Sequence, residues 1–100
     1  MIRPRHPKPD ANQAAIFKQC EDWGAVVWNT SSLGGKKLDG VIFMWGLALP
    51  VEVKMPGHEN DFTEGEIEGM RELSSVGVFP LVVTAFDQIR RWFEVTAEIR

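Results

Sequence analysis

The chain has 100 residues, a formal net charge of −3, and 44% hydrophobic and 25% charged residues. This is the composition of one small globular domain with a modest core, and it excludes a second domain. The single cysteine, Cys20, excludes an internal disulfide and a thiolate zinc site, which favours a reducing compartment. No window approaches the roughly 20 apolar residues that span a bilayer. We therefore expect a cytoplasmic protein, of a size that fits a phage or prophage gene.

Basic and acidic residues are unevenly distributed along the chain. Residues 1–37 carry six Lys/Arg and three acids, whereas residues 38–100 carry five and eleven. Because basic groups can collect on one face, the negative net charge does not exclude a nucleic-acid partner.

The first ten residues contain three prolines and four basic or titratable side chains, namely Arg3, Arg5, His6 and Lys8. This pattern predicts an extended basic arm, which is either a frayed terminus or a phosphate-contacting segment. Residues 11–100 are expected to form a single domain. It begins with a short amphipathic helix over 11–22, with Asp10 as N-cap and Gly24 beyond its end.

A β-prone run over 25–28 is followed by the polar loop 29–37, which contains two glycines and ends in two lysines. Such a loop can present hydroxyl and ammonium groups to a phosphate. The candidate DNA contacts in it are Ser31, Ser32, Lys36 and Lys37. The alternative interpretation is a plain solvated connection.

Residues 41–45 form a continuous apolar run, which predicts a strand covered on both faces. Residues 47–54 alternate instead, with Leu47, Leu49, Val51 and Val53 on one side. Glu52 and Lys54 therefore share the opposite face, roughly 7 Å apart along the strand.

A second helix is predicted over 63–75, then an apolar strand over 78–84 that runs parallel to its neighbour, and a closing helix from Phe86. Arg90 and Arg91 lie on the exposed side of that helix and are further candidate DNA contacts. The order α-β-β-β-α-β-α predicts a small three-layer α/β sandwich with a central mixed β-sheet.

Acidic residues at two neighbouring strands suggest a metal site. Asp39 and Glu52, with the backbone carbonyl of Val53, could bind a divalent ion through hard oxygen ligands. Lys54 could hold the attacking water and offset negative charge on a phosphate. Each part also has an ordinary explanation, because Asp39-Gly40 is a common turn pair and Glu-x-Lys is a common solvated charge pair.

The combination of LDGVIFMW, LPVEVK, the segment TEGEIEGMRELSSVG and the strand FPLVVTAFD resembles the PD-(D/E)XK nuclease superfamily. Among its members the chain looks most like stand-alone VRR-NUC domains, with Holliday junction resolvases next. The resemblance implies a restriction-endonuclease-like core, Mg²⁺ or Mn²⁺ bound by Asp39 and Glu52, and Lys54 as the catalytic lysine. It also implies a homodimer that acts on junction, flap or otherwise branched DNA in repair or recombination.

The chain departs from the family pattern at three positions. Leu38 precedes Asp39 where the family usually has proline. Gln13 stands on the first helix where many relatives carry a glutamate, and Glu66 stands where VRR-NUC domains often have glutamine. Gln13 and Glu66 are thus accessory candidates, although Thr63-x-x-Glu66 is also a capping-box pattern. His58 is a weaker candidate for proton transfer, and a solvated loop histidine is the alternative.

These observations lead to the hypothesis of a metal-dependent endonuclease that hydrolyses DNA phosphodiester bonds with selectivity for DNA structure. The alternative is a catalytically weak nuclease-fold module that binds DNA or a protein. An enzyme that acts on RNA is a third hypothesis.

Overall fold

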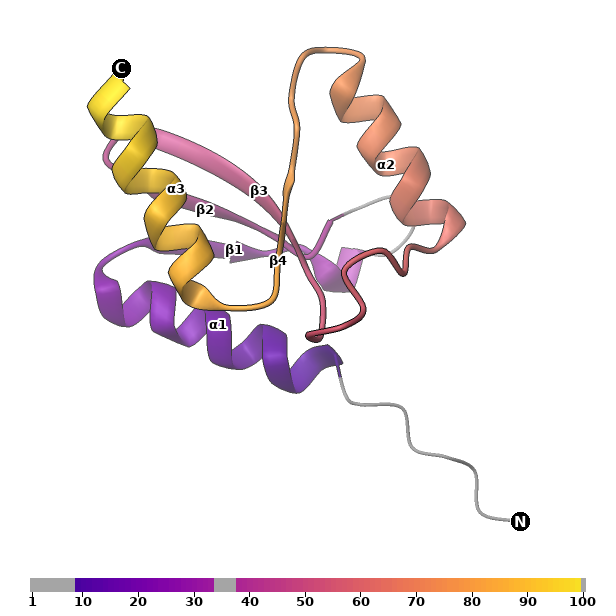
Figure 1. Cartoon of the computed structure of the whole chain (residues 1–100), viewed down its shortest axis with the longest axis horizontal. Coiled ribbons are helices and arrows are strands. Elements are labelled where there is room, and N and C mark those ends of the chain that lie inside the picture. Colours follow the sequence, from indigo (N-terminus) through magenta and orange to yellow (C-terminus); the bar gives the residue numbers. More distant parts are fainter. Residues whose placement is uncertain (1–8, 34–37, 100) are drawn as a thin grey trace.

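The structure, a computed structural model, describes residues 9–33 and 38–99. Its elements are α1 (Pro9–Trp23), β1 (Val26–Asn29), the short 3₁₀ helix η1 (Ser31–Leu33), β2 (Gly40–Met44), β3 (Leu47–Val53), α2 (Glu64–Ser74), β4 (Leu81–Val83) and α3 (Phe86–Ile99) (Figure 1). The chain is thus a small α/β protein with the expected order α-β-β-β-α-β-α. Residues 1–8 of the predicted basic arm, with Lys36 and Lys37, lie outside the described residues.

The four strands form one mixed sheet in the order β1-β2-β3-β4. The first three strands are antiparallel, with Gly40 opposite Val51. β3 and β4 are parallel, with Val53 opposite Val83, which confirms the prediction made from the helical crossover. Trp45 and Gly46 both have positive φ, 53° and 75°, as a tight two-residue hairpin turn between β2 and β3 requires.

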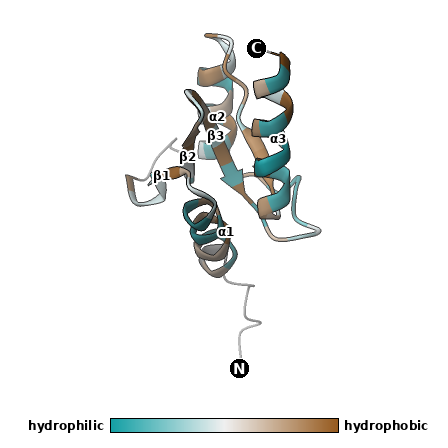
Figure 2. Ribbon diagram, turned by 90° about the vertical axis from the view of Figure 1, so that its left-hand side faces the viewer, coloured by the Kyte–Doolittle hydropathy of each residue, from teal (hydrophilic) through white to brown (hydrophobic). Residues whose placement is uncertain are grey.

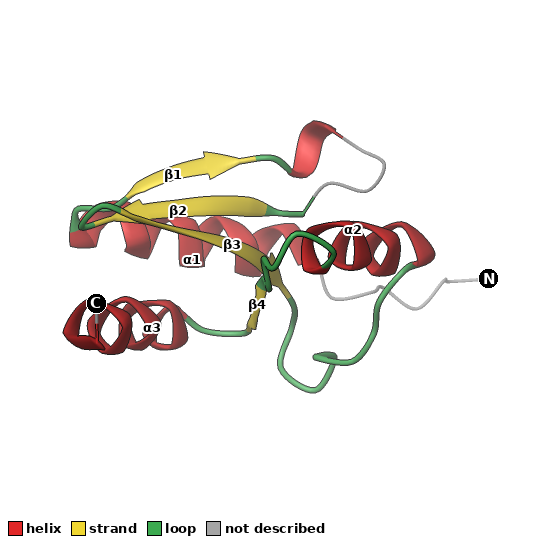
Figure 3. Ribbon diagram, turned by 90° about the horizontal axis from the view of Figure 1, so that it is seen from above, coloured by secondary structure: helices red, strands yellow, loops and turns green. Residues whose placement is uncertain are grey.

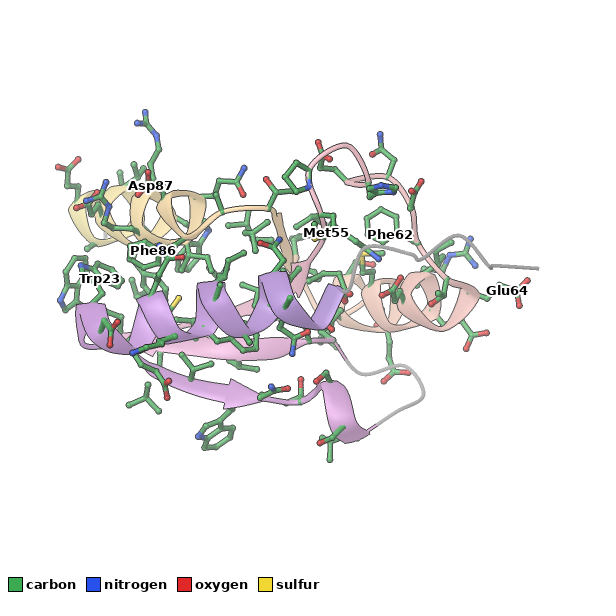
Figure 4. The ribbon with its side chains drawn as sticks, turned by 90° about the horizontal axis from the view of Figure 1, so that it is seen from below. Trp23, Met55, Phe62, Glu64, Phe86 and Asp87 are labelled. Carbon is green, nitrogen blue, oxygen red and sulfur yellow. The ribbon has the colours of Figure 1, made fainter. Side chains whose placement is uncertain are left out.

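One face of the sheet carries the core. Helices α1 and α3 contact each other there and lie against the strands (Figures 3 and 4). The alternation predicted for β3 is confirmed, since Leu49, Val51 and Val53 are buried. They form one cluster with residues of α1, β2, β4 and α3: Ile16, Phe17, Cys20, Ile42, Val83, Ile89 and Phe93.

The other face shows where the sequence-based expectation was wrong. Residues 41–45 are not covered on both faces, because Ile42 is buried whereas Val41 and Phe43 are only half-buried. Trp45 lies in the hairpin turn with its side chain 47% exposed. Figure 3 shows β1 and β2 with no described helix in front of them. Residues 41–45 are therefore apolar on both sides of the strand although only one side is covered, which leaves an open apolar face.

Element boundaries also differ from those expected. α1 begins at Pro9, so Asp10 lies inside the helix and is not its N-cap. Proline suits a first helical turn because its missing N–H would have no partner there. The predicted strand 78–84 is limited to Leu81–Val83. Within the described ranges, no helix combines the length and apolar character needed to cross a membrane.

Candidate active site

Two strand ends bring Asp39 and Glu52 together. β2 and β3 are antiparallel, so the start of β2 meets the end of β3, and the register that pairs Gly40 with Val51 places Asp39 opposite Glu52. Asp39 Oδ2 accepts a hydrogen bond from the backbone N–H of Val53 at 2.8 Å. The antiparallel register therefore fixes one carboxylate beside the other.

Gly40 makes this close approach possible. It begins β2 and is buried, and a Cβ added to it would lie 2.7 Å from Phe17 Cζ and 2.8 Å from the carbonyl oxygen of Trp28. The backbone beside it continues the ladder, because Thr30 N–H donates to Asp39 O at 2.9 Å. The Asp39-Gly40 pair is therefore not a turn; its glycine permits tight packing at the head of β2.

Glu52 is a buried carboxyl with an unsatisfied atom. Its side chain is 2% exposed, and Oε2 has no hydrogen-bond partner among the described residues. Burial, the carboxyl of Glu66 and the negative charge of Asp39 raise the pKa of Glu52 to about 9. A pKa of about 9 means that Glu52 carries a proton at neutral pH when no metal ion is bound.

Lys54 and Glu66 form an ion pair next to these carboxyls. Lys54 Nζ lies 2.9 Å from Glu66 Oε1, and both side chains are largely buried. The ammonium also lies 5.1 Å from the centre of the Phe62 ring, within the range of a cation–π contact. Figure 4 shows Phe62 in the loop that leads into α2. The Lys54 side chain is therefore held by two residues beyond its own strand.

Glu66 caps α2 and also contacts two residues of the candidate site. Thr63 N–H donates to Glu66 Oε1 at 2.8 Å and Glu66 N–H donates to Thr63 Oγ1 at 3.1 Å, which is a complete capping box at the start of α2. The same carboxylate contacts Lys54 and Glu52. Burial alone would raise the pKa of Glu66, but hydrogen bonds from Glu52, Thr63 and Lys54 lower it.

A divalent cation fits this group of residues by its chemistry. A divalent cation that replaced the proton of Glu52 would give Oε2 a partner and offset the negative charges that Asp39, Glu52 and Glu66 would then carry. The N–H and C=O of one strand residue point to the same side, so the carbonyl of Val53 points towards Asp39. In the part of the chain that the structure describes, no three His, Cys, Asp or Glu residues already form a metal-binding arrangement.

Gln13 uses its amide nitrogen to contact the segment after β1. It is buried, and its Nε2 donates to Asn29 Oδ1 at 3.3 Å and to Ser31 Oγ at 3.1 Å. Ser31 also donates to Asn29 Oδ1 at 2.6 Å. In this structure Gln13 thus organises the segment after β1, which carries the exposed candidates Ser31 and Ser32.

The remaining candidates lie away from the carboxyls. Arg90 and Arg91 are exposed on α3, which covers the core face of the sheet, whereas Glu52 and Lys54 lie on the opposite face. Arg90 is paired with Asp87 at 3.3 Å. His58 Nδ1 lies 2.7 Å from Asp61 Oδ2 in an exposed loop. The structure does not bring these residues to the carboxyl group.

Two residues of the site were missed from the sequence. Asn12 Nδ2 donates to the carbonyl oxygens of Lys54 at 2.9 Å and Thr84 at 3.5 Å, so it fixes the backbone at the end of β3. Phe62 contacts Lys54, as described above. Asn12 could have been noticed as the polar neighbour of Gln13, but no local signal marks Phe62.

Comparisons of this chain with protein-family models, curated proteins and solved structures found no match.

Proposed function

We propose that this protein is a metal-dependent endonuclease that hydrolyses phosphodiester bonds of DNA, with selectivity for junctions, flaps or other branched structures. One observation carries the proposal: a buried Glu52, with an unsatisfied oxygen and a pKa raised to about 9, lies beside Asp39, Glu66 and the ammonium of Lys54. Perturbed carboxyls beside a cation are typical of catalytic sites. The resemblance of the motif strands supports a restriction-endonuclease-like core.

The residues have distinct roles in this proposal. Asp39 and Glu52, with the carbonyl of Val53, hold Mg²⁺ or Mn²⁺, and Glu66 is an accessory residue. The bound ion would neutralise the phosphate and lower the pKa of a water molecule. Lys54 holds the attacking water and offsets negative charge on the phosphate. Asn12 keeps the backbone of Lys54 in place, and Phe62 limits where its ammonium can lie.

A cleavage assay tests this function. Labelled four-way junction, flap, linear duplex and RNA substrates are incubated with Mg²⁺ or Mn²⁺, and the wild type is compared with Asp39→Asn, Glu52→Gln and Lys54→Met. We expect each variant to lose at least about 100-fold in rate, the scale of one lost catalytic group. Glu94→Gln and Lys18→Met, both exposed on helices, are matched controls that should cleave like the wild type.

A binding module is the second candidate function. The ion pair with Glu66 already occupies Lys54, and Gln13 places an amide on α1 where a carboxylate was expected. Under this function the wild type would shift a junction in a gel and leave every substrate intact in both metals. That result would overturn the nuclease proposal.

A further inference from the structure

The sheet has an open apolar face on the side away from the core. Alternate residues of the first three strands form this surface, which we call the open apolar face: Val26, Trp28, Val41, Phe43, Ala48 and Pro50. Val26 is 57% exposed and Trp28 is 62% exposed. Figure 2 shows that the sheet is largely hydrophobic apart from the end of β3.

No described element covers the open apolar face. α1 and α3 lie on the opposite side of the sheet, and α2 lies beyond the far end of β3 (Figures 1 and 3). Contiguous exposed apolar surface of this kind marks an interaction site.

The strand register joins the open apolar face to the candidate active site. Trp28 lies opposite Val41, and Val41 lies opposite Pro50, so these residues form one row across the sheet. Asp39 and Glu52 form the next row on the same face, two residues away from Val41 and Pro50 along the chain. From the spacing of strands and residues, the Cα atom of Trp28 lies roughly 9 Å from that of Asp39 and roughly 12 Å from that of Glu52. This distance corresponds to roughly two to four nucleotides of one DNA strand.

Trp28 is exposed and yet held in place. Its ring contacts the ring of Phe43 edge to face, with centroids 4.9 Å apart. The chain that follows is held as well, because Asn29 Oδ1 accepts hydrogen bonds from the N–H and Oγ of Ser31 and from Nε2 of the buried Gln13. A side chain that is ordered before binding loses little freedom when a partner stacks on it.

The chemistry of the two rows selects unpaired nucleic acid as the partner. None of the six side chains is charged, so the face offers nothing to the phosphates that a duplex turns outwards. Unpaired bases instead present ring faces that stack on aromatic side chains. Ser31 and Ser32, which follow Trp28 closely and are exposed, supply hydroxyl donors for the phosphates of the same strand. An apolar protein partner would match the six side chains but not the hydroxyls and carboxyls beside them.

We propose that the open apolar face binds unpaired nucleobases of the substrate, with Trp28 as the stacking residue, and so places a neighbouring phosphate of that strand at Asp39 and Glu52. This inference rests on the proposed function and names the feature of the substrate that is recognised, a single-stranded segment next to the cleaved bond. A flap contains such a segment, whereas a linear duplex does not. The open apolar face thus gives selectivity for DNA structure without any contact that reads the base sequence.

Fluorescence anisotropy with a chelator present measures this binding separately from cleavage. The probe is a labelled DNA duplex with a single-stranded overhang of about ten nucleotides, within the range that one small domain can bind. The second probe has the same overhang built from abasic sites, so that it keeps the phosphates and lacks the bases. The wild type should bind the probe with bases at least about fivefold more tightly, because stacking on one aromatic side chain contributes at least this factor.

Three variants assign the preference to Trp28. Trp28→Ala should bind both probes alike, and Trp28→Phe, which keeps an aromatic ring, should retain most of the preference. Ile99→Ala is the matched control, since Ile99 is 80% exposed at the end of α3, on the opposite side of the sheet, and should bind like the wild type. Trp28 is more than half exposed, so its variants should fold, which circular dichroism and the thermal transition would check.

Two results would overturn this inference. One is a wild type that binds both probes equally well, including the case in which sedimentation shows that a second copy of the chain occupies Trp28. The other is a folded Trp28→Ala variant that keeps the preference for bases. Because the binding test contains no metal ion, it does not depend on cleavage. A protein that prefers the bases through Trp28 and cleaves no substrate would support the binding surface and overturn the nuclease proposal alone.

Discussion

The two faces of the sheet have opposite characters. The face under α1 and α3 is a closed apolar core in which Ile42, Leu49 and Val51 are almost inaccessible to water. The other face carries exposed Trp28 at one edge and, at the end of β3, the buried Glu52 beside Lys54. Close packing on the core face stabilises the fold. This stability offsets the cost of the unsatisfied Glu52 carboxyl and of the uncovered apolar side chains on the other face.

The largest expected difference is between the two faces as sources of stability. Phe93→Ala, on the core face, should lower the free energy of unfolding by about 3–5 kcal/mol, because it leaves a cavity among buried residues. Trp28→Ala, on the open face, should cost about 1 kcal/mol or less. Urea titrations at low protein concentration would compare them. Equal losses would show that the open face is as tightly packed as the core.

A smaller loss of stability is expected from a change at Gly40, the first residue of β2. Gly40→Ala places a methyl group against Phe17 on the core side and against the backbone oxygen of Trp28. Because backbone cannot move aside as a side chain does, we expect a loss of about 1–3 kcal/mol. An unchanged thermal transition would contradict the close packing described at the head of β2.

The open face should also make stability depend on pH. The unfolded chain releases the proton of Glu52 near the ordinary pKa of 4.5, whereas the folded protein keeps it until the pKa of about 9. Between these values the folded state binds more protons, so its stability falls as pH rises, by at most about 1.4 kcal/mol per pH unit. The lowered pKa of Glu66 acts in the other direction, below pH 4.5, where stability is lost as pH falls.

Glu52→Gln isolates this dependence, because it keeps the shape of the side chain and removes its ionisation. Urea unfolding from pH 5 to 9 with a chelator present should show a decline for the wild type and for the exposed control Glu94→Gln, and a nearly flat profile for Glu52→Gln. At the alkaline end, the variant without the acid should be the more stable protein. A wild-type slope that persists in Glu52→Gln would assign the proton to another group.

The smallest expected loss of stability concerns the N-terminal cap of α2. Thr63→Ala removes the hydroxyl that accepts a hydrogen bond from Glu66 N–H, and we expect a loss of about 1 kcal/mol. Because Glu66 also holds Lys54, cleavage should change as well if the site works as proposed. Ser75→Ala, at the other end of α2, keeps Glu66 in place and should leave cleavage unchanged.

Local sequence patterns predict much of the fold, because strand geometry and chain connectivity follow simple rules. Alternation with period two revealed the core face of β3, and the helical crossover predicted that β3 and β4 are parallel. The same reasoning failed for residues 41–45, because a strand that is apolar on both faces looks the same whether its second face is covered or open. The apolar run also predicts a strand at Trp45, because nothing local indicates its positive φ.

The sequence predicts which residues form the candidate site better than it predicts how they contact one another. Residue type and strand position indicate Asp39, Glu52 and Lys54, and the structure places them together. The bond from Asn12 to Lys54 joins residues 42 positions apart, and it depends on how α1 packs against β3. The proton on Glu52 likewise follows from burial and from two carboxyls of other elements, which no short sequence window contains.

The hairpin turn at Trp45-Gly46 lies at the opposite end of the strands from the carboxyls, yet it determines which of them meet. Because the turn has two residues, every pair from Met44 and Leu47 onwards is fixed, and Asp39 comes opposite Glu52. Insertion of one residue into the connection would move Glu52 to the core face and bring Val51 into its place. The candidate site therefore depends on the length of the hairpin turn as much as on Asp39 and Glu52 themselves.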